Sequence, residues 1–123
     1  MPVPGTTFLR HFRDAYVDAL GEARIQQSYG FRSYERFGIV GAASTDAPVV
    51  PTSAVAGLQT MVTRLDDRGR EVGLGERAPL ADAIRAYTVN GAYASFEEGI
   101  KGTLAPGMLG DVTVSGGEVV FAR

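Results

Sequence analysis

Residues 38–49 read Gly-Ile-Val-Gly-Ala-Ala-Ser-Thr-Asp-Ala-Pro-Val, and this stretch decides the fold that the 123-residue chain is predicted to adopt. Its first part is a run of small apolar residues between Gly38 and Pro48. Apolar residues in a continuous run, rather than in alternation, are typical of a strand that is buried on both faces of a parallel sheet. The sequence therefore predicts a short buried strand over about Ile39–Ser44.

The predicted strand ends on polar residues. Ser44, Thr45 and Asp46 place two hydroxyl groups and a carboxylate at its carboxyl end. Ligands bind at this edge in parallel α/β folds, which favours a functional role for Asp46. Asp-x-Pro is also a common turn sequence, in which the carboxylate caps the next turn or forms an Asx turn before Pro48. The residue types alone leave both interpretations open.

The segment Ser-Thr-Asp-Ala-Pro-Val resembles the Ser-Asp-Ala-Pro-Val segment of the metal-dependent amidohydrolases. Within them it is similar to the amidohydrolase-3 branch, which includes the N-substituted formamide deformylases. The resemblance implies that this segment ends strand eight of a (β/α)8 barrel. It also implies that Asp46 binds the catalytic metal, with zinc the expected ion, and accepts a proton from the attacking water. The implied reaction is hydrolysis of non-peptide carbon–nitrogen bonds in a small amide. Thr45 stands where the family more often has serine.

Later segments carry the same resemblance in the same order. Leu80–Phe96 is similar to the final barrel helices of the family, with Gly91 in place of the usual alanine. Lys101–Asp111 is similar to the segment that leads from the barrel back to a small β-sandwich. Two short apolar runs lie around Ser115-Gly116-Gly117, and a glycine pair between such runs indicates a turn. These two runs resemble the closing hairpin of that sandwich. The resemblance extends from about Phe8 to Arg123.

The expected fold class is therefore α/β. We expect residues 1–100 to be the C-terminal fragment of a (β/α)8 barrel, with its last strand and helices. Residues 101–123 are expected to be a return segment with a β-hairpin from the accessory β-sandwich. A complete barrel needs about 250 residues, so the chain is about half as long as one.

Apolar residues at three- and four-residue spacings predict the helices. The longer predicted helices are Phe8–Leu20, Ala54–Thr63 and Leu80–Thr88, and shorter helical pieces are expected at Glu22–Tyr29, Phe31–Phe37 and Asn90–Phe96.

Composition excludes several kinds of protein. A net charge of -2 provides no basic surface for nucleic acid or an anionic membrane, and no apolar run approaches the roughly 20 residues of a membrane span. The N-terminus lacks the pattern of a signal peptide. Cysteine is absent, which excludes disulfides and thiolate metal sites and favours a cytoplasmic location.

The possible metal ligands are few. His11 is the only histidine, and a single histidine on a surface helix is more often a surface residue than a ligand. Catalytic zinc sites take about three protein ligands, so Asp46 alone does not hold a metal. We therefore expect the isolated chain to bind no metal and to be inactive. Three hypotheses follow: a barrel portion that needs the missing N-terminal portion or self-association, a non-catalytic remnant or small interaction module, and a truncated gene product.

Overall fold

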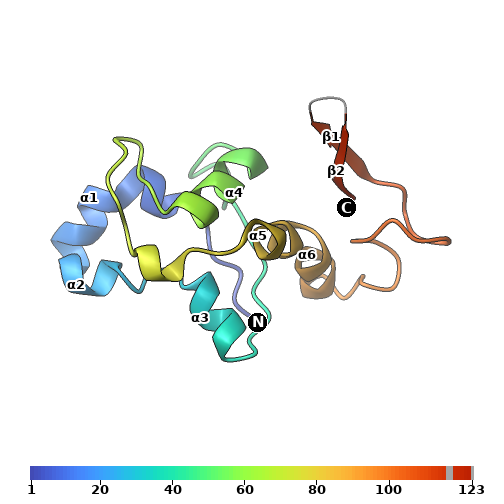
Figure 1. Ribbon diagram of the computed structural model, residues 1–123, viewed down its shortest axis with the longest axis horizontal. Coiled ribbons are helices and arrows are strands. Elements are labelled where there is room, and N and C mark those ends of the chain that lie inside the picture. Colours follow the sequence, from blue (N-terminus) through green and yellow to red (C-terminus); the bar gives the residue numbers. More distant parts are fainter. Residues whose placement is uncertain (116–117, 123) are drawn as a thin grey trace.

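Helices dominate the computed structural model, which describes residues 1–115 and 118–122. Helices α1 and α2 lie at one end, α5 and α6 follow towards the middle, and a two-stranded ribbon lies at the other end (Figure 1). None of the helices in these residues is long and apolar enough to cross a bilayer. The elements are α1 (Phe8–Leu20), α2 (Glu22–Ile25), α3 (Phe31–Arg36), α4 (Ala54–Thr63), the 3-10 helix η1 (Leu74–Glu76), α5 (Leu80–Tyr87), α6 (Val89–Ala94), β1 (Val112–Ser115) and β2 (Glu118–Ala122).

The helical pattern in the sequence was a good guide to these elements. Helices α1 and α4 begin and end at the predicted residues, and α5 ends one residue before its predicted end. The Ser53 hydroxyl caps α4 by accepting a hydrogen bond from the Ala56 N–H at 3.2 Å. The second helical piece is shorter than predicted, since α2 ends at Ile25 and a turn follows it.

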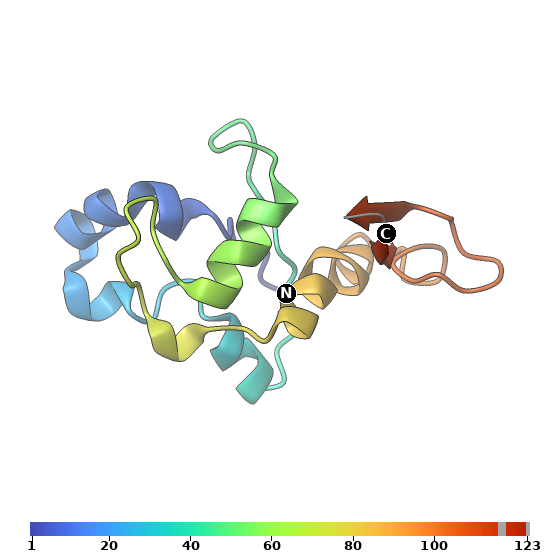
Figure 2. The same cartoon turned by 45° about the horizontal axis from the view of Figure 1, so that its top comes forward.

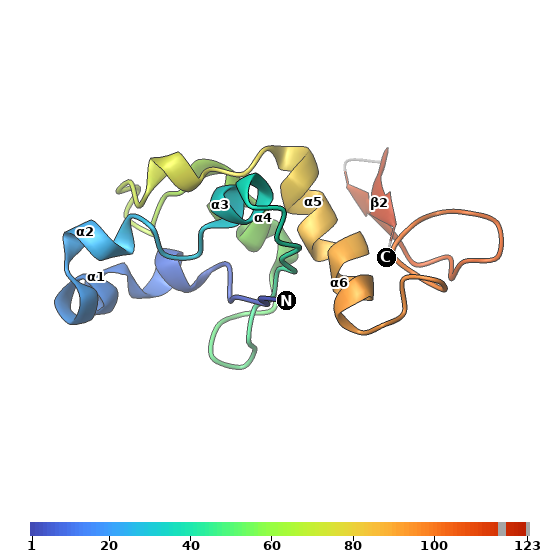
Figure 3. The ribbon, with the colours of Figure 1, turned by 90° about the horizontal axis from the view of Figure 1, so that it is seen from below.

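The predicted strand over Ile39–Ser44 is wrong. This part of the chain is extended but forms no strand, and only a single parallel bridge joins Ser44 to Gly5. Nor is the segment buried on both faces, because Ile39 and Val40 are 46% and 44% exposed. The N-terminal segment lies beside it (Figure 3).

Proline explains why the pairing stops at one bridge. The Ala42 and Ser44 N–H groups donate to the carbonyl oxygens of Pro2 and Pro4 at 3.1 and 3.2 Å, and the Thr6 N–H donates to Ser44 at 2.9 Å. A parallel ladder continues only if the partner segment donates at every second residue, and proline has no N–H to donate. Pro2 and Pro4 therefore accept hydrogen bonds without returning any.

The predicted α/β fold class is also wrong. The described chain is mostly helical and contains no barrel strand. Its only strands, β1 and β2, pair antiparallel with each other and with no third strand, so they do not form part of a β-sandwich. Gly116 and Gly117 of the predicted hairpin turn, and Arg123, lie outside the described residues.

The core consists of two small clusters of buried apolar side chains. Met61 of α4 packs with Ala78, Ala83 and Ala86, the last two from α5. At the other end of the molecule, Leu9 of α1 packs with Ile25 and Val72. Alanine dominates the first cluster, and because a small side chain buries little apolar area, this packing gives modest stabilisation per residue.

A buried arginine joins the end of α4 to segments at the second cluster. Arg64, the C-cap of α4, is 3% exposed and has left-handed backbone geometry (φ 56°). Its guanidinium donates to the carbonyl oxygens of Val72 (2.8 Å), Gly73 (3.2 Å), Tyr29 (3.2 Å) and Ser28 (2.9 Å). Burial lowers the pKa of Arg64 to about 10, which still leaves it charged at neutral pH. The Arg64 side chain therefore fixes the end of α4 to two separate loops.

Candidate functional site

The chain between the extended segment and α4 forms a loop that projects from the body of the molecule (Figure 2). Asp46 belongs to this loop by its place in the sequence. Its backbone is left-handed (φ 55°), and its carbonyl oxygen accepts a hydrogen bond from the Val49 N–H at 3.0 Å. Asp46 thus takes part in the turn through its backbone. Its side chain is exposed, and among the described residues no hydrogen bond or ion pair to its carboxylate is found. The carboxylate is therefore not used as a helix cap here.

An open cavity of about 550 Å³ begins beside Asp46. Ser44, Thr45 and Asp46 form one wall of the cavity. The other walls come from the start of α4, from the junction of α5 and α6, and from the return segment. Their polar residues are Thr52, Tyr87, Thr88, Lys101 and Asp111. Lys101 forms an ion pair with Glu97 and so has a protein partner. The cavity is thus lined by both polar and apolar residues, and Asp46 and Asp111 are the acidic residues among them.

Tyr87 holds the wall that carries Asp46. The Thr6 hydroxyl donates to the carbonyl oxygen of Ser44 at 3.2 Å and forms a short hydrogen bond with the Tyr87 hydroxyl. A Cβ atom on Gly57 of α4 would lie 1.8 Å from the Tyr87 hydroxyl oxygen, so only glycine allows this approach. Burial raises the pKa of Tyr87, which keeps the phenol neutral as a hydrogen-bonding group.

The opposite edge of the extended segment is held by the helices. The Ala43 N–H donates to the Ala86 carbonyl oxygen at 2.9 Å, and the Asn90 side-chain amide donates to the Gly41 carbonyl oxygen at 2.8 Å. With Thr6 on one edge and these two bonds on the other, the backbone leading to Asp46 is fixed on both sides. The turn that carries Asp46 then projects from a positioned base.

Tyr29, which sequence reasoning missed, lies within electrostatic reach of Asp46. The Tyr16 and Tyr29 hydroxyl oxygens are 2.7 Å apart. Burial raises the pKa of Tyr29 far above its ordinary value, and the Tyr16 hydrogen bond and the negative charge of Asp46 add to that rise. Tyr29 therefore stays neutral, and no motif in the sequence marked it.

The described residues do not by themselves fit a metal. Among them there is no group of three or more histidine, aspartate or glutamate side chains that could hold an ion, and the sequence has no cysteine. His11 is not beside Asp46; its Nδ1 lies 2.7 Å from the Asp67 carboxylate on a different loop. Within the described part of the chain, Asp46 therefore belongs to no group of three possible ligands.

Comparison with known proteins gives the family. Residues 3–119 match the amidohydrolase family. The chain is 30% identical over 105 residues to the amidohydrolase-type protein YtcJ of Bacillus subtilis, covering 83% of this chain and 20% of that protein. It is 29% identical over 103 residues to the Arabidopsis thaliana protein LONG AFTER FAR-RED 3, covering 82% of this chain and 18% of that protein.

A solved structure shares the fold of this portion. An uncharacterized metal-dependent hydrolase from Pyrococcus furiosus superposes with a TM-score of 0.64 at 24% identity, over 84% of this chain and 20% of the other. The chain thus spans about a fifth of the length of the relatives that it matches. With the family match covering nearly all of its residues, the chain belongs to the amidohydrolase family.

Proposed function

We propose that the chain supplies the Asp46 part of an amidohydrolase active site and hydrolyses carbon–nitrogen bonds only when the rest of a barrel is present. The observation that carries the proposal is that Asp46, whose side chain is exposed and has no hydrogen-bond or ion-pair partner among the described residues, lines an open cavity. In the completed site Asp46 accepts a proton from the attacking water, because an unpaired carboxylate is a suitable general base. In this proposal residues 1–100 are the barrel portion and residues 101–123 the return segment and hairpin.

Two exposed valines beside the extended segment support the need for the missing portion of the protein. Thr6 contacts Tyr87 of α5, so the alternation of side chains along an extended segment directs Val3 to the opposite face. The bridge between Gly5 and Ser44 sets the register that places Val40 on that same face. Val3 and Val40 are both exposed. We propose that the missing N-terminal barrel portion, or failing that a second copy of the chain, covers this face.

The proposed cofactor and substrate follow from the family. A divalent metal, with zinc the expected ion, would be held by Asp46 together with histidines from the missing portion. Such an ion supplies a nucleophilic water at neutral pH. We propose an N-substituted formamide or a similar small amide as the substrate and the cytoplasm as the location.

A second candidate function is a non-catalytic remnant or small interaction module. The observation that favours it is the lack of a metal-ligand group in the described part of the chain. It predicts that adding the rest of a barrel produces no activity, and that Asp46 serves only in its turn.

Complementation tests the proposal. The chain is mixed or co-expressed with the first four fifths of a relative such as YtcJ, and zinc content and hydrolysis of N-substituted formamides and other amides are measured for each part and for the mixture. We expect no stoichiometric zinc and no hydrolysis for the chain alone, and both for the mixture. A stable complex without hydrolysis of any amide supports the remnant instead. About one tightly held zinc ion on the isolated chain would contradict the ligand count.

A further inference from the structure

The loop between Arg64 and Val72 contacts α1 through charged side chains at its tip. The tip reads Asp66-Asp67-Arg68-Gly69-Arg70 and contains no apolar side chain. The loop closes on itself through an antiparallel bridge between Leu65 and Glu71. The side-chain contacts of the tip with α1 are therefore polar.

The base of the loop is buried. The Val72 N–H donates to the Arg64 carbonyl oxygen at 2.8 Å, and the Arg64 guanidinium donates back to the Val72 carbonyl oxygen at 2.8 Å. Val72 is 1% exposed and packs with Leu9 and Ile25. Salt screens buried contacts much less than exposed ones, so the base keeps its position when ionic strength rises.

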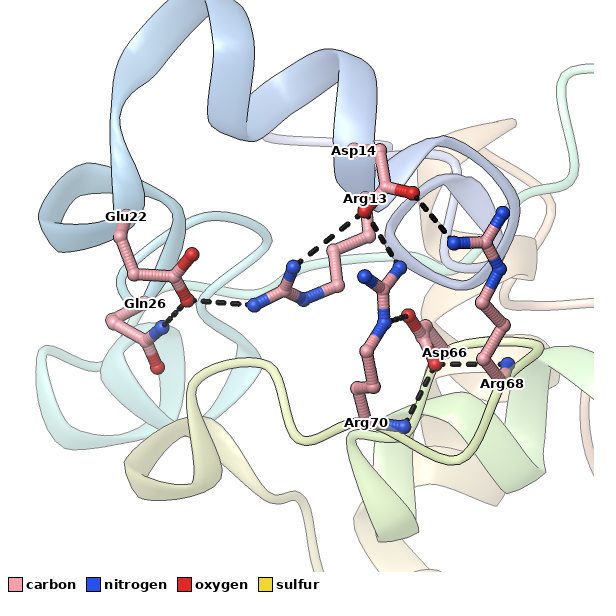
Figure 4. A network of polar contacts seen from close by, with 7 residues as sticks. All are labelled: Arg13, Asp14, Glu22, Gln26, Asp66, Arg68 and Arg70. Atoms are coloured by element: carbon pink, nitrogen blue, oxygen red, sulfur yellow. Dashed lines mark hydrogen bonds and ion pairs between the residues drawn. The ribbon is translucent and has the colours of Figure 1, made fainter.

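The tip is joined to α1 by two groups of ion pairs. In the first, Asp14 of α1 accepts from Arg70 at 2.6 Å and from Arg68 at 3.2 Å, and Arg70 also donates to Asp66 at 2.6 Å (Figure 4). Figure 4 shows the two arginines of the loop directed towards the Asp14 carboxylate from below α1. These carboxylate–guanidinium contacts are short, and the Asp14 side chain is 53% exposed, so they are open to screening.

The second group is one turn earlier on α1. Asp67 of the loop accepts from the Arg10 Nε at 2.6 Å and lies 2.7 Å from the His11 Nδ1. Its own backbone N–H donates to the Arg10 carbonyl oxygen at 3.1 Å. This backbone bond exists only while the tip lies on α1, so the Asp67 amide reports directly on whether the tip is docked.

We propose that the loop tip, residues 66–70, is an ionic latch on α1 that opens and closes about the fixed Arg64–Val72 base. Screening or loss of the ion pairs releases the tip while the fold is kept. Between the tip and α1 lies a cavity of about 150 Å³, and opening separates its two walls and exposes the α1 residues that line it, among them Arg10, Phe12 and Arg13. The loop is thus a conformational device whose closed state depends on charge.

Hydrogen exchange at single amides tests the latch. Exchange of the Asp67 amide is compared with that of the Val72 amide in about 0.05 M and about 1 M sodium chloride, where the screening length falls to about 3 Å. We expect exchange at Asp67 to rise about tenfold with salt and exchange at Val72 to stay unchanged. The Asp14→Asn variant should give the faster Asp67 exchange already at low salt.

Asp18→Asn is the matched control. Asp18 lies on the same helix, is exposed, and forms no ion pair among the described residues. Asp18→Asn therefore removes the same charge from α1 without changing the contacts of the latch. Unaltered Asp67 exchange in both high salt and Asp14→Asn would overturn the proposal. Parallel acceleration at Asp67 and Val72 would also overturn it, because it would mean that the whole region opens rather than the tip.

Discussion

Arg64 and Asp46 are both charged residues with left-handed backbone geometry, at φ 56° and 55°, and the structure uses them in opposite ways. Arg64 is buried and donates to four backbone carbonyl groups from two loops. Asp46 is exposed, and no hydrogen bond or ion pair of its carboxylate is found in the described part of the chain. The charge of Arg64 stabilises the fold, whereas the charge of Asp46 is left available for a ligand.

The comparison shows how positive φ should be interpreted. An unusual backbone conformation at a non-glycine residue suggests function only together with the state of the side chain. At Arg64 the conformation turns the guanidinium inward and ends α4. At Asp46 the residue lines the cavity and its side chain stays exposed. The predictions below test this distinction, beginning with the largest effect on stability.

Removing the Arg64 guanidinium should give the largest loss. Arg64→Met keeps a side chain of similar length but leaves the Val72 and Ser28 carbonyl groups without their donor, while the Gly73 and Tyr29 carbonyl groups keep the Glu76 and Phe31 N–H groups. Each carbonyl group left without a donor costs about 1–3 kcal/mol. We expect the free energy of unfolding to fall by about 3–5 kcal/mol, measured by urea denaturation. Arg24→Met is the control, because Arg24 is exposed and should change stability by less than about 0.5 kcal/mol. Equal losses of stability in Arg64→Met and Arg24→Met would contradict the stabilising role of Arg64.

A Cβ atom at Gly57 should disturb the support of the Asp46 segment. Gly57→Ala places a methyl group 1.8 Å from the Tyr87 hydroxyl oxygen and 2.7 Å from the Thr6 hydroxyl oxygen. Overpacking of this kind costs about 1–3 kcal/mol, which thermal denaturation would detect.

Gly91→Ala is the matched control for Gly57→Ala. Gly91 lies in α6, and a Cβ atom added there would meet nothing within 4 Å, so alanine should raise stability by up to about 1 kcal/mol through helix propensity. A stabilising Gly57→Ala variant would show that the Thr6–Tyr87 contact does not hold the segment.

Acid should reveal a smaller contribution from Asp66. Burial alone would raise the pKa of Asp66, but hydrogen bonds from Arg68 and Arg70 outweigh it, so the pKa lies below its usual value. The stabilisation is therefore present above the ordinary aspartate pKa of about 3.9 and is lost as the pH falls through the lower folded value. We expect Asp66→Asn to lower stability by roughly 1 kcal/mol at pH 7 and by less in acid, measured as melting temperature against pH. A difference that stays constant down to about pH 2 would contradict this.

The local sequence pattern predicted the helices, whereas the features that it did not predict depend on contacts between residues far apart in the sequence. The bounds of α1 and α4 follow from apolar spacing and from signals close in the sequence. The error over Ile39–Ser44 arose because its neighbour is the proline-containing N-terminal segment, about 40 residues away. A signal for the Thr6–Tyr87 contact did exist, since an isolated glycine in a helical pattern, here Gly57, often marks a close approach.

The candidate site was predictable only in part. Asp46 was found because a carboxylate after an apolar segment in this motif points to a ligand-binding edge. The roles of Arg64 and Tyr29 depend on burial and on carbonyl groups from distant loops, for which residue type alone gives no signal. The catalytic role of Asp46 remains a prediction.

The Asp46→Asn variant, assayed with the complementing barrel portion, tests the central claim most directly. Because an amide does not accept the proton of the attacking water, we predict that kcat falls by about 10²–10⁴-fold. We also predict a nearly unchanged melting temperature, since the turn uses the Asp46 carbonyl group rather than its carboxylate. A kcat close to that of the unaltered protein, whether or not stability changes, would contradict the assignment of Asp46 as the group that accepts a proton from the attacking water.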